Sequence, residues 1–159
     1  MQEQGLNLLA QRVIEARLAA RLVEAFAQEL GRERALAVLR RSSQEQARQA
    51  GRELARRWKG GGLLQFSRVL DIWQEGGALE LEILQRDGHH LRFNVTRCRY
   101  AEEYRRLGLD PELGYCLSCC RDAPLAQGFD PHIELLRSKT IMQGDGLCDF
   151  HFRLAPAGQ

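Results

Sequence analysis

Hydrophobic residues in the first thirty positions recur every three or four residues, which is the period of one face of an α-helix. The series consists of Leu6, Leu9, Val13, Ala16, Ala20, Val23, Ala27 and Leu30. Gly31 follows, and glycine is common just past the end of a helix. The pattern predicts one long helix that buries a single stripe. Because the stripe contains several alanines, it also suits a contact between two copies of the chain, but we favour packing within the chain.

A second helical series begins after Gly31 and ends at three consecutive glycines, residues 60–62. Its apolar positions are Leu36, Leu39, Ala47, Ala50, Leu54 and Trp58. The two series predict an antiparallel helix pair. A third run with helical spacing comprises Leu63, Phe66, Leu70 and Trp73 and stops at the glycine pair 76–77.

The period then changes from three or four to two, which indicates β-strands. Leu79, Leu81 and Ile83 alternate with charged residues, Asp87 and Gly88 supply a hairpin turn, and residues 91, 93 and 95 alternate on the return strand. Further strands are expected over residues 132–142 and 147–154, joined by a turn around residues 144–146. Short helices are expected over residues 100–107 and 111–122.

These elements predict an α+β fold in which N-terminal helices pack on an antiparallel sheet of about four strands. A chain of 159 residues with 44% hydrophobic residues has the size and composition of one globular domain. We therefore expect a single domain over residues 1–159. Its helical part covers residues 1–75, and its sheet part covers residues 76–159 and carries the candidate site.

Charge and hydropathy narrow the classes of function. No segment approaches the roughly 18 to 20 uninterrupted apolar residues of a membrane-spanning helix. The first residues lack the pattern of a secretory signal, so we expect a cytoplasmic protein. Residues 1–59 carry 12 Lys and Arg against 7 Asp and Glu. These charges alternate around helices without a stacking aromatic series, so we expect neither a nucleic-acid nor a membrane partner.

The chemically distinctive residues are five cysteines, an odd number that suits a complete disulfide framework badly. In the cytoplasm they are expected to stay reduced. Cys116, Cys119 and Cys120 fall in one predicted helix at spacings that place all three on one side, with Asp122 one turn beyond Cys119. The other two thiols belong to predicted strands. Cys98 ends the second strand, and Cys148 shares a face of the last strand with residues 150 and 152.

Three interpretations of these thiols remain open from the residues alone. Reduced cysteines pack as small hydrophobic side chains in a core. A four-thiolate zinc or iron-sulfur site is also possible, with Cys98, Cys116, Cys119 and Cys148 as ligands. The third interpretation is nucleophilic catalysis by Cys119 with Asp122 as its proton partner.

At these positions the sequence resembles the L-2-amino-thiazoline-4-carboxylic acid hydrolase family. The resemblance covers nearly the whole chain and includes the helical start, residues 14–16 and 30–35. Its most specific segments are residues 94–102 (Asn-Val-Thr-Arg-Cys-Arg-Tyr-Ala-Glu), 107–108, Cys119-x-x-Asp122, Asp130-Pro131, Arg137-Ser138-Lys139-Thr140, Gly144-Asp145 and Cys148-Asp149-Phe150. The chain departs from the family pattern at Asp130 and Ser138, and Cys116 and Cys120 are additional thiols.

The resemblance implies a bacterial hydrolase that opens the cyclic amidine of 2-amino-thiazoline-4-carboxylate to a carbamoyl-cysteine and needs no cofactor. Carried over to this chain, it singles out Cys98, Cys119, Asp122, Arg137, Cys148 and Asp149. In the mechanism that we expect, Cys119, or Cys98 if it is better placed, attacks the amidine carbon and Asp122 transfers protons. Arg137 holds the substrate carboxylate. Substrate binding is assigned to Arg137, Arg97, Thr140 and Asp149.

Two classes compete with a hydrolase that acts on a small-molecule substrate. A non-catalytic sensor or binding module, similar in outline to the 4-vinyl reductase-like domains, would bind a small hydrophobic ligand or a metal through cysteine. A purely structural protein would form a homo-oligomer through the N-terminal stripe. Charged residues in place of Ala20 and Ala27 would dissociate such an oligomer.

Overall fold

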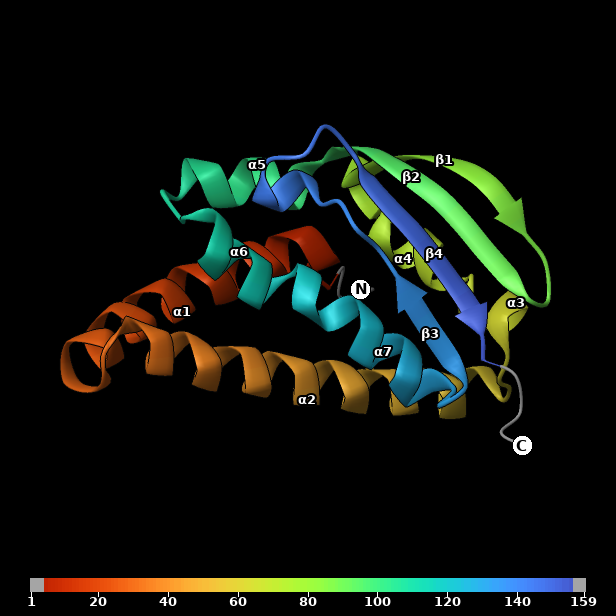
Figure 1. Ribbon diagram of the computed structural model, residues 1–159, viewed down its shortest axis with the longest axis horizontal. Helices are drawn as coiled ribbons and strands as arrows, with labels where there is room; N and C mark the ends of the chain where they lie inside the picture. The colour runs from red at the N-terminus through yellow and green to blue at the C-terminus, as the bar shows by residue number, and fades with distance from the viewer. Residues whose placement is uncertain (1–4, 156–159) are drawn as a thin grey trace.

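The computed structural model describes residues 5–155 of the chain. Residues 1–4 and 156–159 are outside the described range. The expectation about a secretory signal rests on the first residues of the chain, which lie outside that range. In Figure 1 a pair of long helices lies along one side of the molecule, and a four-stranded sheet lies on the other. Some of the shorter helices lie between the long pair and the sheet, and others lie beyond one end of the sheet.

The two long helices form the antiparallel pair that the sequence predicts. Helix α1 (Leu8–Leu30) begins where the side chain of Asn7 accepts a hydrogen bond from the backbone of Ala10, 2.9 Å away. Helix α2 (Arg32–Trp58) starts directly after Gly31. The backbone of Gly31 has φ of 81°, a conformation that glycine adopts without steric strain and that lets the chain reverse in one residue.

The stripe identified in the first helix faces the rest of its own chain. Leu9, Ala16 and Val23 are buried there, and Ala20 and Ala27 pack against the same core. The opposite side of α1 is apolar as well. Its exposed members are Ile14, Leu18, Leu22 and Phe26, and the two end members of the predicted stripe, Leu6 and Leu30, are exposed as well. Charging Ala20 or Ala27 would therefore disturb the internal core of the chain.

The third helical run is divided, whereas the sequence pattern predicts one helix. Helix α3 (Leu63–Phe66) and helix α4 (Val69–Trp73) are separated by Ser67 and Arg68, and a short 3-10 turn, η1 (Glu75–Gly77), follows. The buried hydroxyl of Ser67 donates to the carbonyl oxygen of Leu64 at 2.7 Å and accepts from Arg86 Nε at 2.9 Å. These bonds satisfy a hydroxyl that would otherwise be buried without a partner.

The sheet confirms the predicted fold class, because four antiparallel strands pair in the order β1-β2-β4-β3. The strands are β1 (Leu79–Arg86), β2 (His90–Cys98), β3 (Ile133–Leu136) and β4 (Cys148–Leu154). Strand β3 is shorter than predicted because the chain leaves the sheet after Leu136. It passes through Arg137 and a 3-10 turn, η3 (Ile141–Gln143), before β4 begins.

The segment between β2 and β3 contains more elements than the sequence predicts. Helix α5 (Arg99–Arg106) is the expected one, but the helix expected over residues 111–122 is interrupted at Ser118, which has φ of −119° and ψ of −73°. Helix α6 (Pro111–Leu117) therefore ends early. A 3-10 turn, η2 (Cys119–Arg121), and helix α7 (Asp122–Phe129) follow it. The break changes the direction in which the three neighbouring thiols point.

Helix α7 lies against α2 so closely that their backbones touch. A Cβ atom built on Gly128 would lie 2.0 Å from the carbonyl oxygen of Arg48, and one on Gly51 would lie 2.1 Å from that of Leu125. Real Cβ atoms essentially never approach another atom so closely. The two glycines thus permit the contact that fixes α7, whose first residue is Asp122.

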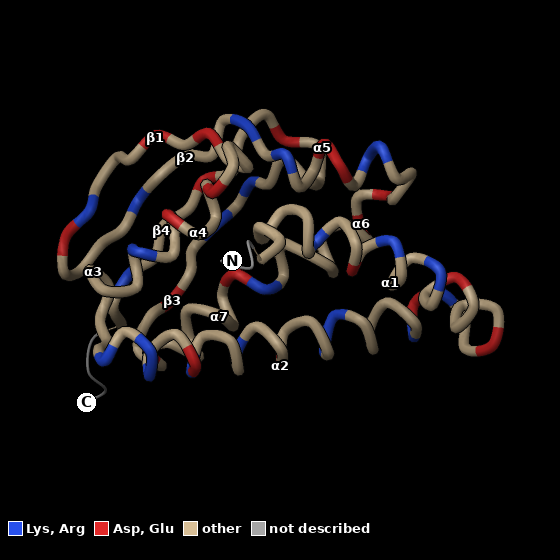
Figure 2. The backbone as a smooth tube through the Cα atoms, turned by 180° about the vertical axis from the view of Figure 1, so that it is seen from behind, with Lys and Arg blue, Asp and Glu red and all other residues tan. Residues whose placement is uncertain are grey.

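Figure 2 shows basic and acidic residues interleaved along the long helices, as the sequence suggested. None of the helices within residues 5–155 combines the length and the apolar character that crossing a membrane would require.

Candidate functional site

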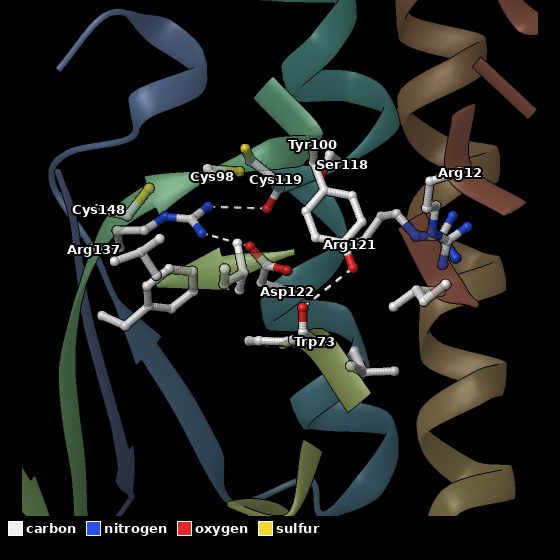
Figure 3. Close-up of a pocket in the computed structure, with 15 residues that line it drawn as sticks. Arg12, Trp73, Cys98, Tyr100, Ser118, Cys119, Arg121, Asp122, Arg137 and Cys148 are labelled. Atoms are coloured by element: carbon white, nitrogen blue, oxygen red, sulfur yellow. Dashed lines mark hydrogen bonds and ion pairs between the residues drawn. The ribbon is translucent and has the colours of Figure 1, made fainter. Parts of the chain in front are cut away.

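A pocket of about 100 Å³ lies where α1, the sheet and the η2–α7 segment meet. Figure 3 shows thiols at one end of it, arginines at both ends and aromatic rings between them. Its polar and sulfur-bearing lining residues are Arg12, Cys98, Tyr100, Ser118, Cys119, Arg121, Asp122, Arg137 and Cys148, and its apolar ones are Leu8, Trp73, Leu79, Val95, Leu125 and Phe150. The lining therefore includes α1 and α4 as well as the sheet part, so the site extends beyond residues 76–159.

Three separate elements bring three thiols into this pocket. Cys98 is the last residue of β2 and the N-cap of α5. Cys148 is the first residue of β4 and pairs with Val95, three positions before Cys98. Cys119 starts η2, directly after the break at Ser118. The expectation that Cys98, Cys119 and Cys148 converge agrees with this geometry.

The pocket environment favours the protonated form of Cys98, but less than burial alone would. Burial raises the pKa of Cys98 to about 11. The backbone N–H groups of Ala101 and Tyr100, in the first turn of α5, oppose this rise in pKa. Amide groups at a helix N-terminus stabilise a nearby negative charge, so the position of Cys98 is the kind that supports a thiolate.

The other two thiols are less suited to ionise. Burial, followed by the negative charge of Asp122, raises the pKa of Cys119 well above its ordinary value. Burial also raises the pKa of Cys148, whose sulfur accepts a hydrogen bond from the backbone of Ile141 at 3.2 Å. Each of these thiols is therefore a neutral group at the pocket wall.

Asp122 and Arg137 form an ion pair in the pocket wall near the three thiols. Arg137 Nη1 lies 2.5 Å from Asp122 Oδ2, and its Nη2 donates to the carbonyl oxygen of Cys119 at 2.9 Å. The guanidinium also stacks over the ring of Phe150, 4.7 Å from the ring centre. Arg137 is thus already committed to three groups of its own chain.

The two partners of this pair affect each other's pKa. Burial raises the pKa of the Asp122 carboxyl above its ordinary value, and the charge and hydrogen bond of Arg137 oppose that rise. Burial acts against the charged form of Arg137, but the Asp122 carboxylate outweighs it and raises the pKa of Arg137. Arg137 therefore keeps Asp122 closer to its ionised form than burial alone would allow.

Replacing Arg137 by glutamine is expected to lower the free energy of unfolding at pH 7 by about 3 kcal/mol, because a buried carboxylate loses its partner. The pKa of Asp122 then rises further above its unfolded value. Its destabilising effect is absent below the unfolded pKa, grows as pH rises from the unfolded to the folded pKa, and is complete above the folded one. Urea unfolding at pH 7 and pH 4.5 should therefore show part of the loss recovered at the lower pH.

The double variant Arg137→Gln with Asp122→Asn is the matched control. It removes both charges and should be more stable at pH 7 than Arg137→Gln alone, with little difference between the two pH values. Equal stability of wild type and Arg137→Gln at pH 7 would contradict the role of the pair.

Asp149 and Thr140 hold the segment that carries Arg137 and do not line the pocket. The carboxylate of Asp149 accepts hydrogen bonds from the backbone and hydroxyl of Ser138 and from the backbone of Lys139, at 2.6 to 2.9 Å. Thr140 caps η3 through its bonds to Gln143. Both residues were expected to bind substrate, but their side chains are used to fix the loop after β3.

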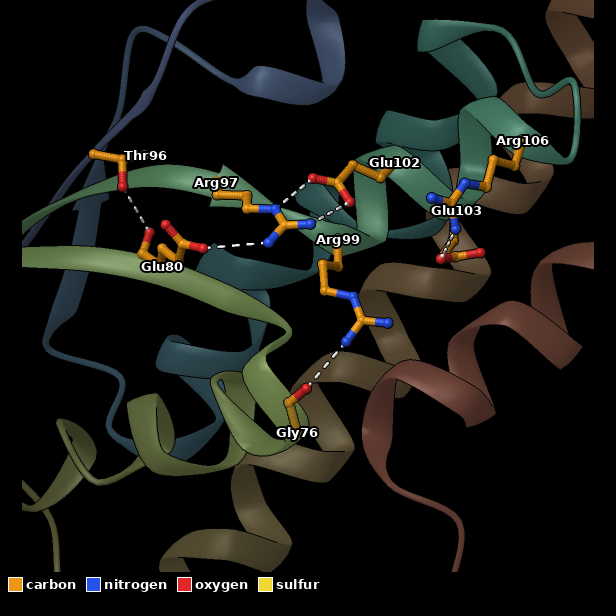
Figure 4. A network of polar contacts seen from close by, with 8 residues as sticks. All are labelled: Gly76, Glu80, Thr96, Arg97, Arg99, Glu102, Glu103 and Arg106. Atoms are coloured by element: carbon orange, nitrogen blue, oxygen red, sulfur yellow. Dashed lines mark hydrogen bonds and ion pairs between the residues drawn. The ribbon is translucent and has the colours of Figure 1, made fainter.

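Arg97 is also outside the pocket, contrary to the sequence expectation. It follows Thr96 on β2 and points to the opposite face of the sheet from the buried residues, where half of its side chain is exposed. Figure 4 shows its guanidinium between Glu102 on α5 and Glu80 on β1. Strict alternation would put Arg97 on the same face as Val95, two positions before it, but the pairing skips Thr96, since Glu80 pairs with Arg97 and Leu81 with Val95. This β-bulge turns Arg97 to the exposed face and its neighbour Cys98 to the buried one.

Cys116 and Cys120 do not join the three pocket thiols. Cys116 is fully buried and lies beside Arg40 of α2, and Cys120 donates a hydrogen bond to the carbonyl oxygen of Cys116 at 3.0 Å. Because the helix is broken at Ser118, the side chains of Cys116 and Cys120 point in a different direction from that of Cys119. Within residues 5–155, no three or more His, Cys, Asp and Glu side chains are arranged to hold a metal ion. The four-thiolate set that includes Cys116 is therefore not assembled there.

Sequence reasoning missed the contribution of the helical part to the pocket. Arg12 lies between Leu9 and Val13 of the buried stripe, and its place in the helical period is that of an ordinary solvent-exposed residue. The helical spacing of Trp73 predicts only a core position. Its carbonyl oxygen accepts from the hydroxyl of Tyr100 at 3.4 Å. No motif marks these residues, since only the packing of α1 and α4 against the sheet brings them to the site.

The chain is similar to a known protein family in sequence and to a solved sensory domain in fold. A family model described as L-2-amino-thiazoline-4-carboxylic acid hydrolase matches residues 11–152. None of the curated proteins matches the sequence of this chain. Among solved structures, the phenol-responsive sensory domain of the transcription activator PoxR, crystallised with phenol, is similar with a TM-score of 0.55 at 16% identity. The match covers 87% of this chain and 73% of that one, and at this identity it shows a shared fold.

Proposed function

This chain belongs to the L-2-amino-thiazoline-4-carboxylic acid hydrolase family, and on that premise we propose that it opens a small cyclic amidine by hydrolysis in the pocket around Cys98. One observation carries the proposal. A thiol at a helix N-terminus, a carboxylate and a guanidinium line the same small pocket. These are the groups that covalent catalysis by cysteine requires: a nucleophile, a proton acceptor and a residue that keeps the acceptor charged.

Cys98 is better placed as the nucleophile than Cys119. The amide groups of α5 favour the thiolate of Cys98, whereas the charge with the largest effect on Cys119 is the carboxylate of Asp122, which disfavours a thiolate. Asp122 lines the same pocket as both thiols, and its charge raises the pKa of each. We assign Asp122 as the group that accepts and returns the proton.

The reaction consumes one water molecule and proceeds in two steps. In the first step the sulfur of Cys98 bonds to the amidine carbon, and the bond from that carbon to the ring sulfur breaks. The proton of Cys98 passes through Asp122 to the leaving sulfur. In the second step water adds to the same carbon, the bond to Cys98 breaks, and the thiol regains a proton. The product is a carbamoyl-cysteine.

The direct test is to incubate the purified protein with 2-amino-thiazoline-4-carboxylate and to follow carbamoyl-cysteine by mass spectrometry. Hydrolysis in H₂¹⁸O should place one labelled oxygen in the carbamoyl group. Related small rings, such as hydantoins, provide a comparison of substrates. Absence of turnover for every cyclic amidine and amide in such a screen would refute the proposed function.

The pKa of Cys98 leads to a prediction for its alkylation by iodoacetamide. Because only the thiolate reacts and the pKa is about 11, the rate at Cys98 should rise about tenfold per pH unit from pH 7.5 to pH 10. At each pH, Cys98 should react faster than Cys119, whose pKa is raised more strongly. Peptide mass spectrometry after timed quenching measures both rates. A rate at Cys98 that levels off below pH 9 would contradict the predicted environment.

A second candidate function is the binding of a small aromatic molecule without turnover. The observation that favours it is that the pKa values of all three pocket thiols are raised in a lining rich in apolar and aromatic groups. The similarly folded domain of PoxR contains phenol. Isothermal titration with phenol tests this function. Phenol binding, combined with no hydrolysis of any cyclic amidine, would favour the sensor over the hydrolase.

A further inference from the structure

The end of the pocket opposite the thiols carries two arginines that the proposed chemistry does not use. Arg12 comes from α1 and Arg121 from η2, and both line the pocket. Figure 3 shows them together on the far side of Tyr100 and Asp122 from Arg137 and Cys148. Residues more than a hundred positions apart in the sequence thus place two guanidinium groups at one end of one cavity.

Arg121 has little within the chain to balance its charge. Among residues 5–155 no carboxylate lies within ion-pair distance of it, and its one side-chain hydrogen bond is to the neutral amide of Gln46 at 3.4 Å. Burial and the positive charge of Arg12 both lower the pKa of Arg121. Buried charges in proteins are normally paired, so an unpaired guanidinium that faces a cavity is a candidate to bind an anion.

Arg12 adds to this positive end although it has one acidic neighbour. Its Nη1 lies 2.6 Å from Glu15 on the same helix, and the side chain of Glu15 is more than half exposed to solvent. Arg12 itself is mostly buried, with 20% of its side chain exposed. An exposed carboxylate is screened by water, so Glu15 balances the two positive charges only in part.

The total charge of the lining points in the same direction. The lining contains three arginines, Arg12, Arg121 and Arg137, and one carboxylate, Asp122. The sequence suggested that Arg137 holds the substrate carboxylate. Its two terminal nitrogens are instead bonded to Asp122 and to the carbonyl oxygen of Cys119, so they are not free for that role. The positive charge that remains available is at the Arg12 and Arg121 end.

We propose that Arg12 and Arg121 bind the carboxylate of the pocket's ligand, so that its ring lies against Trp73 and Tyr100 and its reactive carbon faces Cys98. Such a ligand carries a carboxylate for the two arginines to hold, which a neutral phenol lacks. The proposal rests on the proposed function only in taking this pocket to be the substrate site. The cavity of about 100 Å³ is smaller than the apolar cavity of about 150 Å³ that holds benzene, so it restricts the ligand to one small ring.

Binding of two stable aromatic probes tests the proposal without any turnover. Thiazole-4-carboxylate and unsubstituted thiazole differ only in the carboxylate, and isothermal titration measures both. Wild type should bind the carboxylate at least about tenfold more tightly, since a charge-assisted hydrogen bond contributes about 1.5 to 3 kcal/mol. Arg121→Gln should lower the affinity for thiazole-4-carboxylate by about 10- to 100-fold. Its affinity for thiazole should not change.

Arg12→Gln should lower the same carboxylate affinity, and Arg17→Gln is the matched control, because Arg17 is an exposed arginine on the same helix outside the pocket lining. Unchanged preference for the carboxylate in Arg121→Gln and Arg12→Gln would overturn the proposal, as would a failure of wild type to bind thiazole-4-carboxylate at millimolar concentration. Retained carboxylate preference without hydrolysis of any amidine would instead refute only the proposed function.

Discussion

Replacing Cys98 by serine is expected to lower kcat for the cyclic amidine by at least about a thousandfold, the order of loss when a nucleophile is removed from a catalytic unit. The serine hydroxyl is a far weaker nucleophile because it ionises much less readily than a thiol. The amide groups at the start of α5 cannot compensate for that difference. The measurement is single-turnover hydrolysis of 2-amino-thiazoline-4-carboxylate by each variant, followed by mass spectrometry.

Cys119→Ser provides the matched control, since it changes a second thiol in the same pocket. We expect a decrease of no more than about tenfold, because Cys119 serves the site through its carbonyl oxygen, which holds Arg137. Binding of thiazole-4-carboxylate should be retained in both variants. If Cys119→Ser is inactive and Cys98→Ser is active, the nucleophile has been assigned to the wrong thiol.

Replacing Gly128 by alanine is expected to lower the free energy of unfolding by about 3 kcal/mol or more. Helix propensity alone predicts the opposite result, since alanine is favoured over glycine inside a helix by about 1 kcal/mol. The steric effect should win because the added Cβ would lie 2.0 Å from the carbonyl oxygen of Arg48, which is backbone that cannot rotate away. Urea unfolding followed by circular dichroism measures the difference.

Gly146→Ala is the control for this prediction, because a Cβ there meets nothing within 4 Å and the residue lacks a positive φ. It should leave the unfolding midpoint nearly unchanged. A variant Gly128→Ala that is too unstable to purify agrees with the expected result. A midpoint equal to or above that of wild type would show that α2 and α7 can separate without loss.

The regular elements were predictable where a single period extends over many residues. The long helices and the hairpin of β1 and β2 follow directly from positions such as Leu9, Ala16, Leu91 and Phe93. The break at Ser118 was not predictable, because a helical period runs through residues 113–120 without interruption. Tertiary packing overrides local preference there, and it reverses the expectation that Cys116 and Cys119 share one side.

The candidate site could be predicted in part, through its most distinctive side chains. Thiols and a nearby acid stand out in a sequence, so Cys98, Cys119 and Asp122 were identified before their geometry was known. Arginines do not stand out in a chain with this many of them. Arg97 and Arg12 look equally plausible as surface residues. The bulge at Thr96 turns Arg97 away from the pocket, and the packing of α1 against the sheet part brings Arg12 to it.

The walls of the pocket come from opposite ends of the chain, with Leu8 and Arg12 on one side and Cys148 and Phe150 on the other. A molecule that needs both walls binds only to the fully folded chain and must therefore stabilise it as a whole. At a concentration one hundred times its Kd, such a ligand adds about 2.7 kcal/mol to stability. For a protein of this size that amounts to an increase in melting temperature of roughly 5 to 10 °C. Thermal melting thus reports occupancy of the pocket for any compound, whether or not the compound is turned over.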